Sequence, residues 1–91
     1  MRRIKVERRP SPERLKELGV KQWRIWNKEV SEFPWTYDEP ETGYFLAGEV
    51  TVTGEDGEVV EVGQGDLVTF PAGMSCKWKI SRDVKKHYRF G

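Results

Sequence analysis

The sequence predicts an all-β domain, a sandwich or barrel of short strands with one short N-terminal helix. Apolar side chains alternate with charged ones in several short runs, as at residues 76–80, where Lys77 and Lys79 separate Cys76, Trp78 and Ile80. Alternation with a period of two is typical of a half-buried strand. Glycine and proline interrupt these runs at frequent intervals, which favours many strands over long helices. Only the stretch from Pro10 onward has the pattern of a helix start.

Size and charge limit the classes of function. The 91 residues are expected to form one domain, with a strand and helix cover at 1–20 and the barrel at 21–91. The net charge of +1 gives no reason to expect binding to nucleic acid or to a membrane surface. One cysteine excludes an intramolecular disulfide, and the sequence shows no signal-peptide pattern and no long apolar run. We therefore expect a cytoplasmic protein.

The first twenty residues predict a short edge strand followed by a helix. Residues 1–9 alternate weakly between apolar and charged side chains. Ser11 can cap the helix, Pro12 suits its first position, and Gly19 can end it. We expect this helix to cover an end of the barrel.

The rest of the chain predicts strands that are separated by turn residues. The expected strands cover residues 20–31, 33–37, 41–46, 49–53, 58–62, 67–70, 76–80 and 84–90. The strongest turn signal, Gly-Glu-Asp-Gly at 54–57, should close a hairpin between the strands on either side. Gly48 indicates a bend or a close approach of two backbones, Pro71 should end a strand, and Gly73 suits a tight turn.

The last predicted strand should close the barrel. Its apolar side chains alternate with polar ones, and they are Val84, Tyr88 and Phe90. The residues that oppose them are Lys85, His87 and Arg89. Lys85, Lys86 and Arg89 also form a basic run, which we interpret as solvated surface.

Two stretches resemble the sequence motifs of the cupins, a superfamily of small β-barrels. The second cupin motif reads Gly, five residues, Pro-x-Gly, two residues, His, three residues, Asn. Gly65, Pro71 and Gly73 match this motif, whereas Cys76 stands at the histidine and Ile80 at the asparagine.

The first cupin motif reads His-x-His, three or four residues, Glu, six residues, Gly. Glu41 and Gly48 match it, and Trp35 and Tyr37 occupy the two histidine places. Residues 33–35, 41–44 and 65–73 look most like the ureidoglycine-aminohydrolase branch of small single-domain cupins. The resemblance implies an antiparallel β-barrel of the jelly-roll type.

The motif positions predict no metal site. A transition metal needs several imidazole, thiolate or carboxylate ligands at about 2.0–2.3 Å. Trp35 cannot ligate a metal, and Tyr37 is a poor ligand unless its phenol is ionised. Glu41 and Cys76 alone make a weak site, unless His87 supplies a third ligand. We therefore expect no metal and no other cofactor.

Glu41 and Cys76 are the candidate catalytic residues, and each has a structural alternative. In an aromatic interior Glu41 can act as a general acid or base, or it can hydrogen-bond Tyr37 or backbone amides. Cys76 can act as a nucleophile only beside an activating base, for which His87 is the one imidazole available. Otherwise Cys76 packs as a small apolar group or a pocket wall.

The expected binding pocket consists of Trp35, Tyr37, Glu41, Cys76 and Trp78. Such a pocket suits a small planar or partly apolar ligand that carries a hydrogen-bond donor. We predict a small-molecule-binding barrel that lacks the usual histidine ligands. The alternative is an enzyme of the ureidoglycine-aminohydrolase type that hydrolyses a small ureide or amide, with a metal or with Glu41 and Cys76. The surplus of aromatic residues predicts a homodimer.

Overall fold

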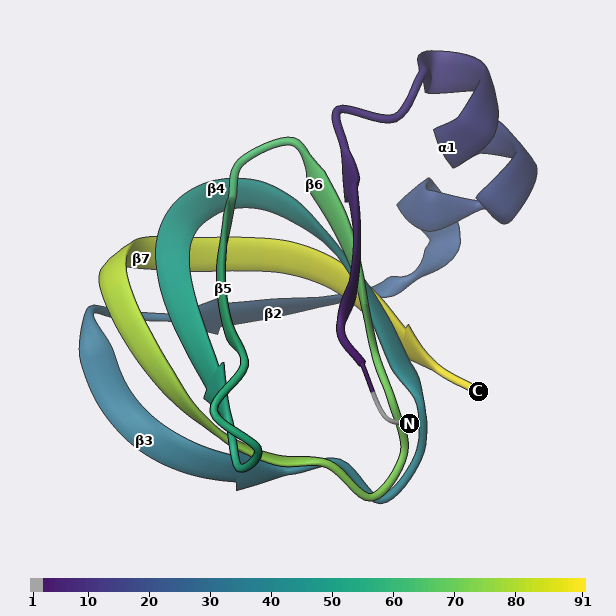
Figure 1. Cartoon of the computed structure of the whole chain (residues 1–91). Coiled ribbons are helices and arrows are strands. Elements are labelled where there is room, and N and C mark those ends of the chain that lie inside the picture. Colours follow the sequence, from purple (N-terminus) through teal and green to yellow (C-terminus); the bar gives the residue numbers. More distant parts are fainter. Residues whose placement is uncertain (1–2) are drawn as a thin grey trace.

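Seven strands form one antiparallel sheet that curls into a barrel, with a helix beside it (Figure 1). The computed structural model describes residues 3–91. In chain order the elements are β1 (Lys5–Arg8), α1 (Pro12–Leu18), the 3-10 turn η1 (Val20–Gln22), β2 (Arg24–Lys28), β3 (Ser31–Thr36), β4 (Glu41–Gly54), β5 (Val59–Gly63), β6 (Asp66–Phe70) and β7 (Ser75–Phe90). The predicted all-β fold with one short N-terminal helix is confirmed.

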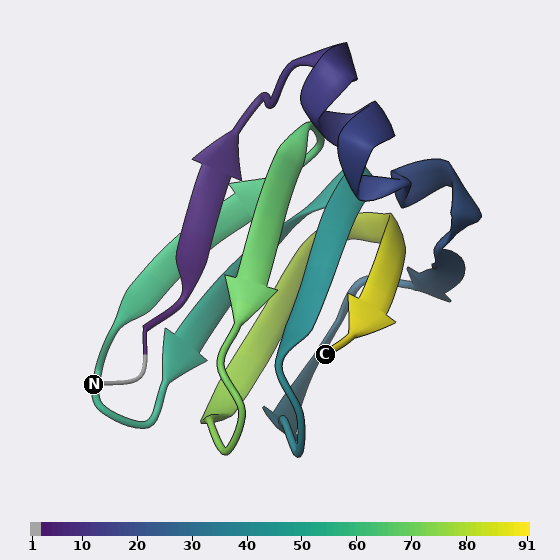
Figure 2. The same ribbon diagram turned by 90° about the vertical axis from the view of Figure 1, so that its right-hand side faces the viewer.

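Two long strands, β4 and β7, hold the sheet together. They pair with each other from Glu41 opposite Phe90 to Gly54 opposite Cys76. Along its other edge, β7 pairs first with β3 and then with β2. The free edge of β4 pairs with β6 and then with β5, and β1 extends the sheet beyond β6. Figure 2 shows β1, β6, the start of β4 and the end of β7 side by side in one layer.

Both long strands bend near Gly48, where their backbones approach each other closely. This glycine has φ +110°, and a Cβ built on it would lie 2.8 Å from the Asp83 carbonyl oxygen and 2.8 Å from the Val84 Cα atom. The pairing of β4 with β7 shifts register around this point and then continues. The predicted bend is confirmed. The separate strands predicted at 41–46 and 49–53, and at 76–80 and 84–90, are instead two continuous strands, because each pairs with the other through the bend.

The shorter elements follow the sequence pattern closely. Ser11 caps α1 by accepting a hydrogen bond of 3.2 Å from the Arg14 amide, and Gly19 ends the helix with φ +70°. The helix has no fully buried residue and lies beyond the start of β6, beside residues 44 and 46 inside β4 (Figure 2). The predicted hairpin is confirmed, with Val50 opposite Val62 in β4 and β5. The strand predicted at 20–31 is wrong at its start, which forms η1, and β2 begins at Arg24.

The register of β7 puts its first lysines outside the barrel. Lys77 and Lys79 are exposed, whereas Cys76, Trp78 and Ile80 are buried, as the alternation predicts. The largest fully buried side chains make up the core: Trp78, Phe45, Phe70, Ile80, Val50, Val52 and Val68. Among residues 3–91, no helix is long and apolar enough to cross a membrane.

Candidate functional site

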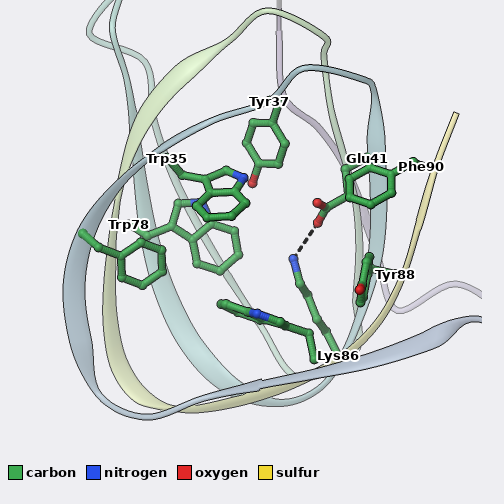
Figure 3. A pocket seen from close by; sticks show the side chains of 9 residues that line it. Trp35, Tyr37, Glu41, Trp78, Lys86, Tyr88 and Phe90 are labelled. Carbon is green, nitrogen blue, oxygen red and sulfur yellow. Dashed lines mark hydrogen bonds and ion pairs between the residues drawn. The ribbon is translucent and has the colours of Figure 1, made fainter.

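A cavity of about 190 Å³ lies inside the barrel, and aromatic rings form most of its wall (Figure 3). Strands β2, β3, β4 and β7 contribute its lining, which consists of Trp26, Phe33, Trp35, Tyr37, Glu41, Trp78, Lys86, Tyr88 and Phe90. Two-residue alternation puts Phe33 and Trp35 on the same face of β3, as the sequence predicts. Trp35 and Phe90 remain about half exposed, at 47% and 51%. The cavity therefore combines buried side chains in its interior with apolar side chains that reach solvent.

An ion pair between Lys86 and Glu41 supplies the charged groups of this cavity. The Lys86 Nζ atom donates a hydrogen bond of 2.7 Å to Glu41 Oε2 (Figure 3). The two side chains are only 5% and 6% exposed. Glu41 begins β4 and Lys86 lies on the inward face of β7, so pairing of these two strands brings the charges together. A buried ammonium is tolerated here because a carboxylate compensates its charge.

Aromatic rings surround the Lys86 ammonium on several sides. Its Nζ atom lies 4.8 Å from the ring centroid of Trp78 and 4.9 Å from that of Trp26. Three further rings lie between 5.7 and 5.9 Å away, those of Phe45, Phe70 and Tyr88. Their π faces attract a cation. Burial nevertheless lowers the pKa of the Lys86 ammonium, and the attraction of the Glu41 carboxylate opposes this change.

Lys86 is the functional residue that the sequence interpretation missed. The basic run of Lys85, Lys86 and Arg89 is not uniformly solvated, because Lys86 is 4% exposed while Lys85 is exposed. The signal that identifies it is its spacing. Lys86 lies two positions from Val84 and two from Tyr88, so it shares their face of β7, which is the apolar face of this predicted strand. Two-residue alternation therefore turns it inward.

Tyr37 and Trp78 add polar atoms to the aromatic wall. The Tyr37 ring stacks on Phe70 with the centroids 4.7 Å apart, and its hydroxyl points into the cavity (Figure 3). Burial raises the pKa of the Tyr37 phenol well above its ordinary value, so the hydroxyl keeps its proton. The buried indole Nε1 of Trp78 lies beside Tyr37 and Cys76 and opposes the rise of the pKa of both groups, although no hydrogen bond of full geometry forms. Both side chains therefore offer hydrogen-bond donors in this part of the barrel.

Cys76 is close to the cavity but does not line it, which corrects the predicted pocket. The side chain is 7% exposed, and its Sγ atom donates to the Trp35 carbonyl oxygen at 3.6 Å. Desolvation raises the pKa of the Cys76 thiol from 9.0 to about 11. A nucleophilic cysteine needs the opposite change. His87 cannot activate this thiol, because its Nδ1 atom lies 3.2 Å from the Trp23 carbonyl oxygen and the ring faces away from the cavity.

The groups around Glu41 do not fit a metal ion. Glu41 Oε2 already accepts the Lys86 ammonium, whose charge would repel a divalent cation at the same place. Tyr37 keeps its proton and Trp35 offers only a donor. Within residues 3–91, no group of three or more His, Cys, Asp or Glu side chains is arranged to hold a metal. Glu41, Cys76 and His87 therefore do not form the three-ligand site considered from the sequence.

The family follows from comparison with known proteins. The model of the EutQ-like cupin domain matches residues 15–88. This chain belongs to the EutQ-like cupin family. A crystal structure of a DUF861-family protein from Thermotoga maritima is 54% identical, with a TM-score of 0.95, covering 98% of this chain and 100% of that chain. A comparison with curated proteins gave no match.

Two further structures show how the cupin domain occurs in longer relatives. A DUF861-family protein from Pseudomonas syringae pv. tomato DC3000 is 28% identical with a TM-score of 0.64, over 70% of this chain and 28% of that chain. The Clostridium difficile EutQ protein is 18% identical with a TM-score of 0.63, over 97% of this chain and 67% of that chain, a likeness of fold. The cupin motifs of the sequence therefore lie in an EutQ-like cupin barrel.

Proposed function

We propose that this EutQ-like cupin binds a small planar molecule in the aromatic cavity and recognises it through the Glu41–Lys86 ion pair. The buried pair, with its Nζ–Oε2 distance of 2.7 Å, is the observation that carries the proposal. A buried ion pair generally stabilises a fold no better than apolar side chains of similar volume. Recognition of a polar ligand gives a reason for this small core to contain a buried ion pair that adds little to the stability of the fold.

The chemistry of the lining defines the ligand. The cavity volume of about 190 Å³ is below the ~300–1,000 Å³ that is usual for sites of drug-sized ligands, which favours a small molecule. Rings from Trp26, Phe33 and Trp78 can pack on a planar group. The pair presents a donor, the ammonium, next to an acceptor, the carboxylate. An amide or ureide group, with its carbonyl next to an N–H, is the complement of this arrangement.

Titration with benzamide, followed by NMR, tests this binding. The indole N–H signals of Trp26, Trp35 and Trp78 report on the cavity wall, and Trp23 lies outside the lining and serves as an internal reference. We expect the three cavity signals to shift and the Trp23 signal to stay in place. Glu41→Gln should weaken binding by roughly 10-fold or more, since hydrogen bonds to charged groups contribute about 1.5–3 kcal/mol. Lys77→Met, at the surface, is the matched control. Shifts confined to other residues would exclude the cavity as the binding site.

Hydrolysis of a small ureide or amide is the second candidate, as in the ureidoglycine-aminohydrolase branch that the sequence resembles. The ion pair favours it, because a carboxylate can accept a proton from water while an ammonium stabilises the developing oxyanion. In this version water is the nucleophile, and Cys76, whose thiol does not line the cavity, has no catalytic part. Release of ammonia from N-carbamoylglycine measures the activity. Equal release by the wild type and by Glu41→Gln would exclude the hydrolytic role.

A homodimer remains a prediction. Several apolar side chains are between 47% and 59% exposed, among them Ile25, Trp35, Val59 and Phe90. Single exposed residues are ordinary, but a pair at the cavity opening gives a second copy of the chain a surface to cover. Light scattering at micromolar concentration should give twice the monomer mass.

A further inference from the structure

We propose that Lys86 is a nucleophile that forms an imine with a small aldehyde or ketone bound in the cavity. This inference rests on the proposed function, because the cavity must first admit the ligand. It adds a covalent site and a ligand class, planar carbonyl compounds. The proposal is built on the position of the amine, on its proton acceptor and on the rings around it.

The position of Lys86 brings its amine to a place where a bound carbonyl carbon can reach it. Lys86 lines the cavity, although its side chain is only 5% exposed. Its neighbour Lys85 faces outward from the same strand and is exposed. The walls around Lys86 are mostly aromatic, so little water competes with the amine for a carbonyl group.

Glu41 supplies the proton acceptor that an attacking ammonium requires. The Nζ and Oε2 atoms lie 2.7 Å apart in a direct hydrogen bond, and transfer of the shared proton to Glu41 frees the lone pair of the Lys86 amine. Burial also lowers the pKa of the Lys86 ammonium, which is the established way to activate a lysine in an apolar pocket.

The reaction balances with the groups present. The Nζ lone pair forms a bond to the carbonyl carbon, and the carbonyl oxygen takes the proton held by Glu41, which gives a carbinolamine. This carbinolamine is still protonated on nitrogen, and Glu41, now a carboxylate again, takes one proton from that nitrogen. Glu41 then gives this proton to the hydroxyl group, which leaves as water, so that a protonated imine remains. The sum is ammonium plus carbonyl compound giving iminium plus water. The rings of Trp26 and Trp78, centred 4.9 and 4.8 Å from Nζ, attract the iminium cation as they attract the ammonium.

Reductive trapping tests the proposal on the folded wild-type protein. Benzaldehyde with cyanoborohydride converts an imine into a stable secondary amine, and peptide mapping then identifies the labelled lysine. We expect Lys86 to be labelled several-fold faster than Lys85, the exposed neighbour, because its lowered pKa gives a larger neutral fraction and the cavity holds the carbonyl group beside it. In urea-unfolded protein the two lysines should be labelled at similar rates. Labelling of Lys85 and other surface lysines ahead of Lys86 in the folded state would overturn the proposal.

Two comparisons separate this inference from the binding that it requires. Glu41→Gln should slow labelling of Lys86 while leaving that of Lys85 unchanged, since the amide cannot accept the proton. An unchanged Lys86 rate in a folded Glu41→Gln variant would overturn the role of Glu41. Benzamide, which binds without reacting, should protect Lys86 from benzaldehyde. If benzamide shifts the cavity tryptophans but Lys86 is not trapped, imine formation is wrong and binding stands. If neither occurs, the proposed function fails as well.

Discussion

The two halves of β7 differ in that only the second half has a lysine on the inward face of the strand. In the first half Lys77 and Lys79 are exposed and alternate with the buried Cys76 and Trp78. In the second half Lys85 is exposed but Lys86 is buried. The halves share one strand, one pairing partner in β4 and a similar density of charge. Lys86 occupies an inward position in the two-residue alternation, and its contacts explain how a charge is accommodated there.

Contacts on neighbouring strands decide the outcome. Lys77 lies 3.3 Å from Glu32, in a surface pair whose side chains are 61% and 50% exposed. Lys86 contacts the Glu41 carboxylate, which is almost fully buried. Aromatic rings from β2, β4, β6 and β7 surround the Lys86 ammonium. Water screens the first pair, whereas nothing screens the second. A lysine can thus lie inside a small barrel when both a carboxylate and aromatic faces are provided for it.

The largest effect is expected from Lys86→Met, which removes the buried cation and leaves the Glu41 carboxylate without its partner. We expect the free energy of unfolding to fall by about 3–5 kcal/mol. Urea denaturation at neutral pH measures it.

Two controls accompany this variant. Lys77→Met, in the surface pair with Glu32, should change the free energy of unfolding by less than about 1 kcal/mol. The double variant Glu41→Leu/Lys86→Met should recover most of the lost stability, because apolar side chains can replace a buried pair. Equal losses from Lys77→Met and Lys86→Met would remove the distinction between the two halves of β7.

Gly48→Ala should have the next largest effect, because Gly48 lies where β7 passes from one half to the other. Its φ of +110° disfavours a side chain, and the added Cβ would lie 2.8 Å from backbone atoms of Asp83 and Val84. We expect a loss of about 2–3 kcal/mol, measured by thermal or urea unfolding. Gly57→Ala is the matched control, since it has φ +89° but no atom within 4 Å. It should cost only about 1 kcal/mol. Similar losses for both glycines would show that the close approach of the strands at Gly48 has no energetic importance.

A smaller effect is expected from the Cys76 thiol in the first half of β7. Its pKa is raised from 9.0 in the unfolded chain to about 11 in the folded protein. Between these values the unfolded state loses a proton that the folded state keeps, so wild-type stability falls as the pH rises through this window. The stability advantage of the wild type over Cys76→Ala should therefore shrink by about 1 kcal/mol between pH ~8 and ~11, reduced from the full linkage value because the thiol is incompletely buried. A constant difference over this range would contradict the raised pKa.

Much of the barrel could be predicted because its signals are local. Two-residue alternation identified the inward faces around Trp35 and Trp78, and the Gly54–Gly57 turn gave the register of its hairpin. Gly48 was recognisable because a glycine between two apolar runs marks a bend or a close approach. Alternation grouped Trp35 with Tyr37, and the resemblance to the cupin motif added Glu41 to the candidate site.

The ion pair could not be predicted, because its partners come from distant parts of the chain. Glu41 and Lys86 are 45 positions apart, and no local pattern shows that they meet. Within the basic run at 85–89, the sequence interpretation relied on the charge of Lys86 and not on its position in the two-residue alternation of the strand. Cys76 is on the same inward face of β7 as Trp78, yet its thiol contacts the Trp35 backbone and does not reach the cavity. The pairing of β3 with β7 determines this position, and no local sequence pattern shows it. Three polar residues at 81–83 interrupt the apolar alternation and therefore indicated a gap between two strands, although β7 continues through them.

The central position of β7 also affects the order in which the barrel can assemble. Within the described residues, β2 and β3 pair with no strand other than β7, which begins only at Ser75, whereas β3 ends at Thr36. During synthesis these two strands leave the ribosome without a partner, and the cavity wall that they carry stays exposed to solvent. The sheet can close only when residues 75–90 become available, so folding should be a late and cooperative event. The Glu41–Lys86 pair then forms in that same step, since one of its members arrives with the strand that completes the barrel.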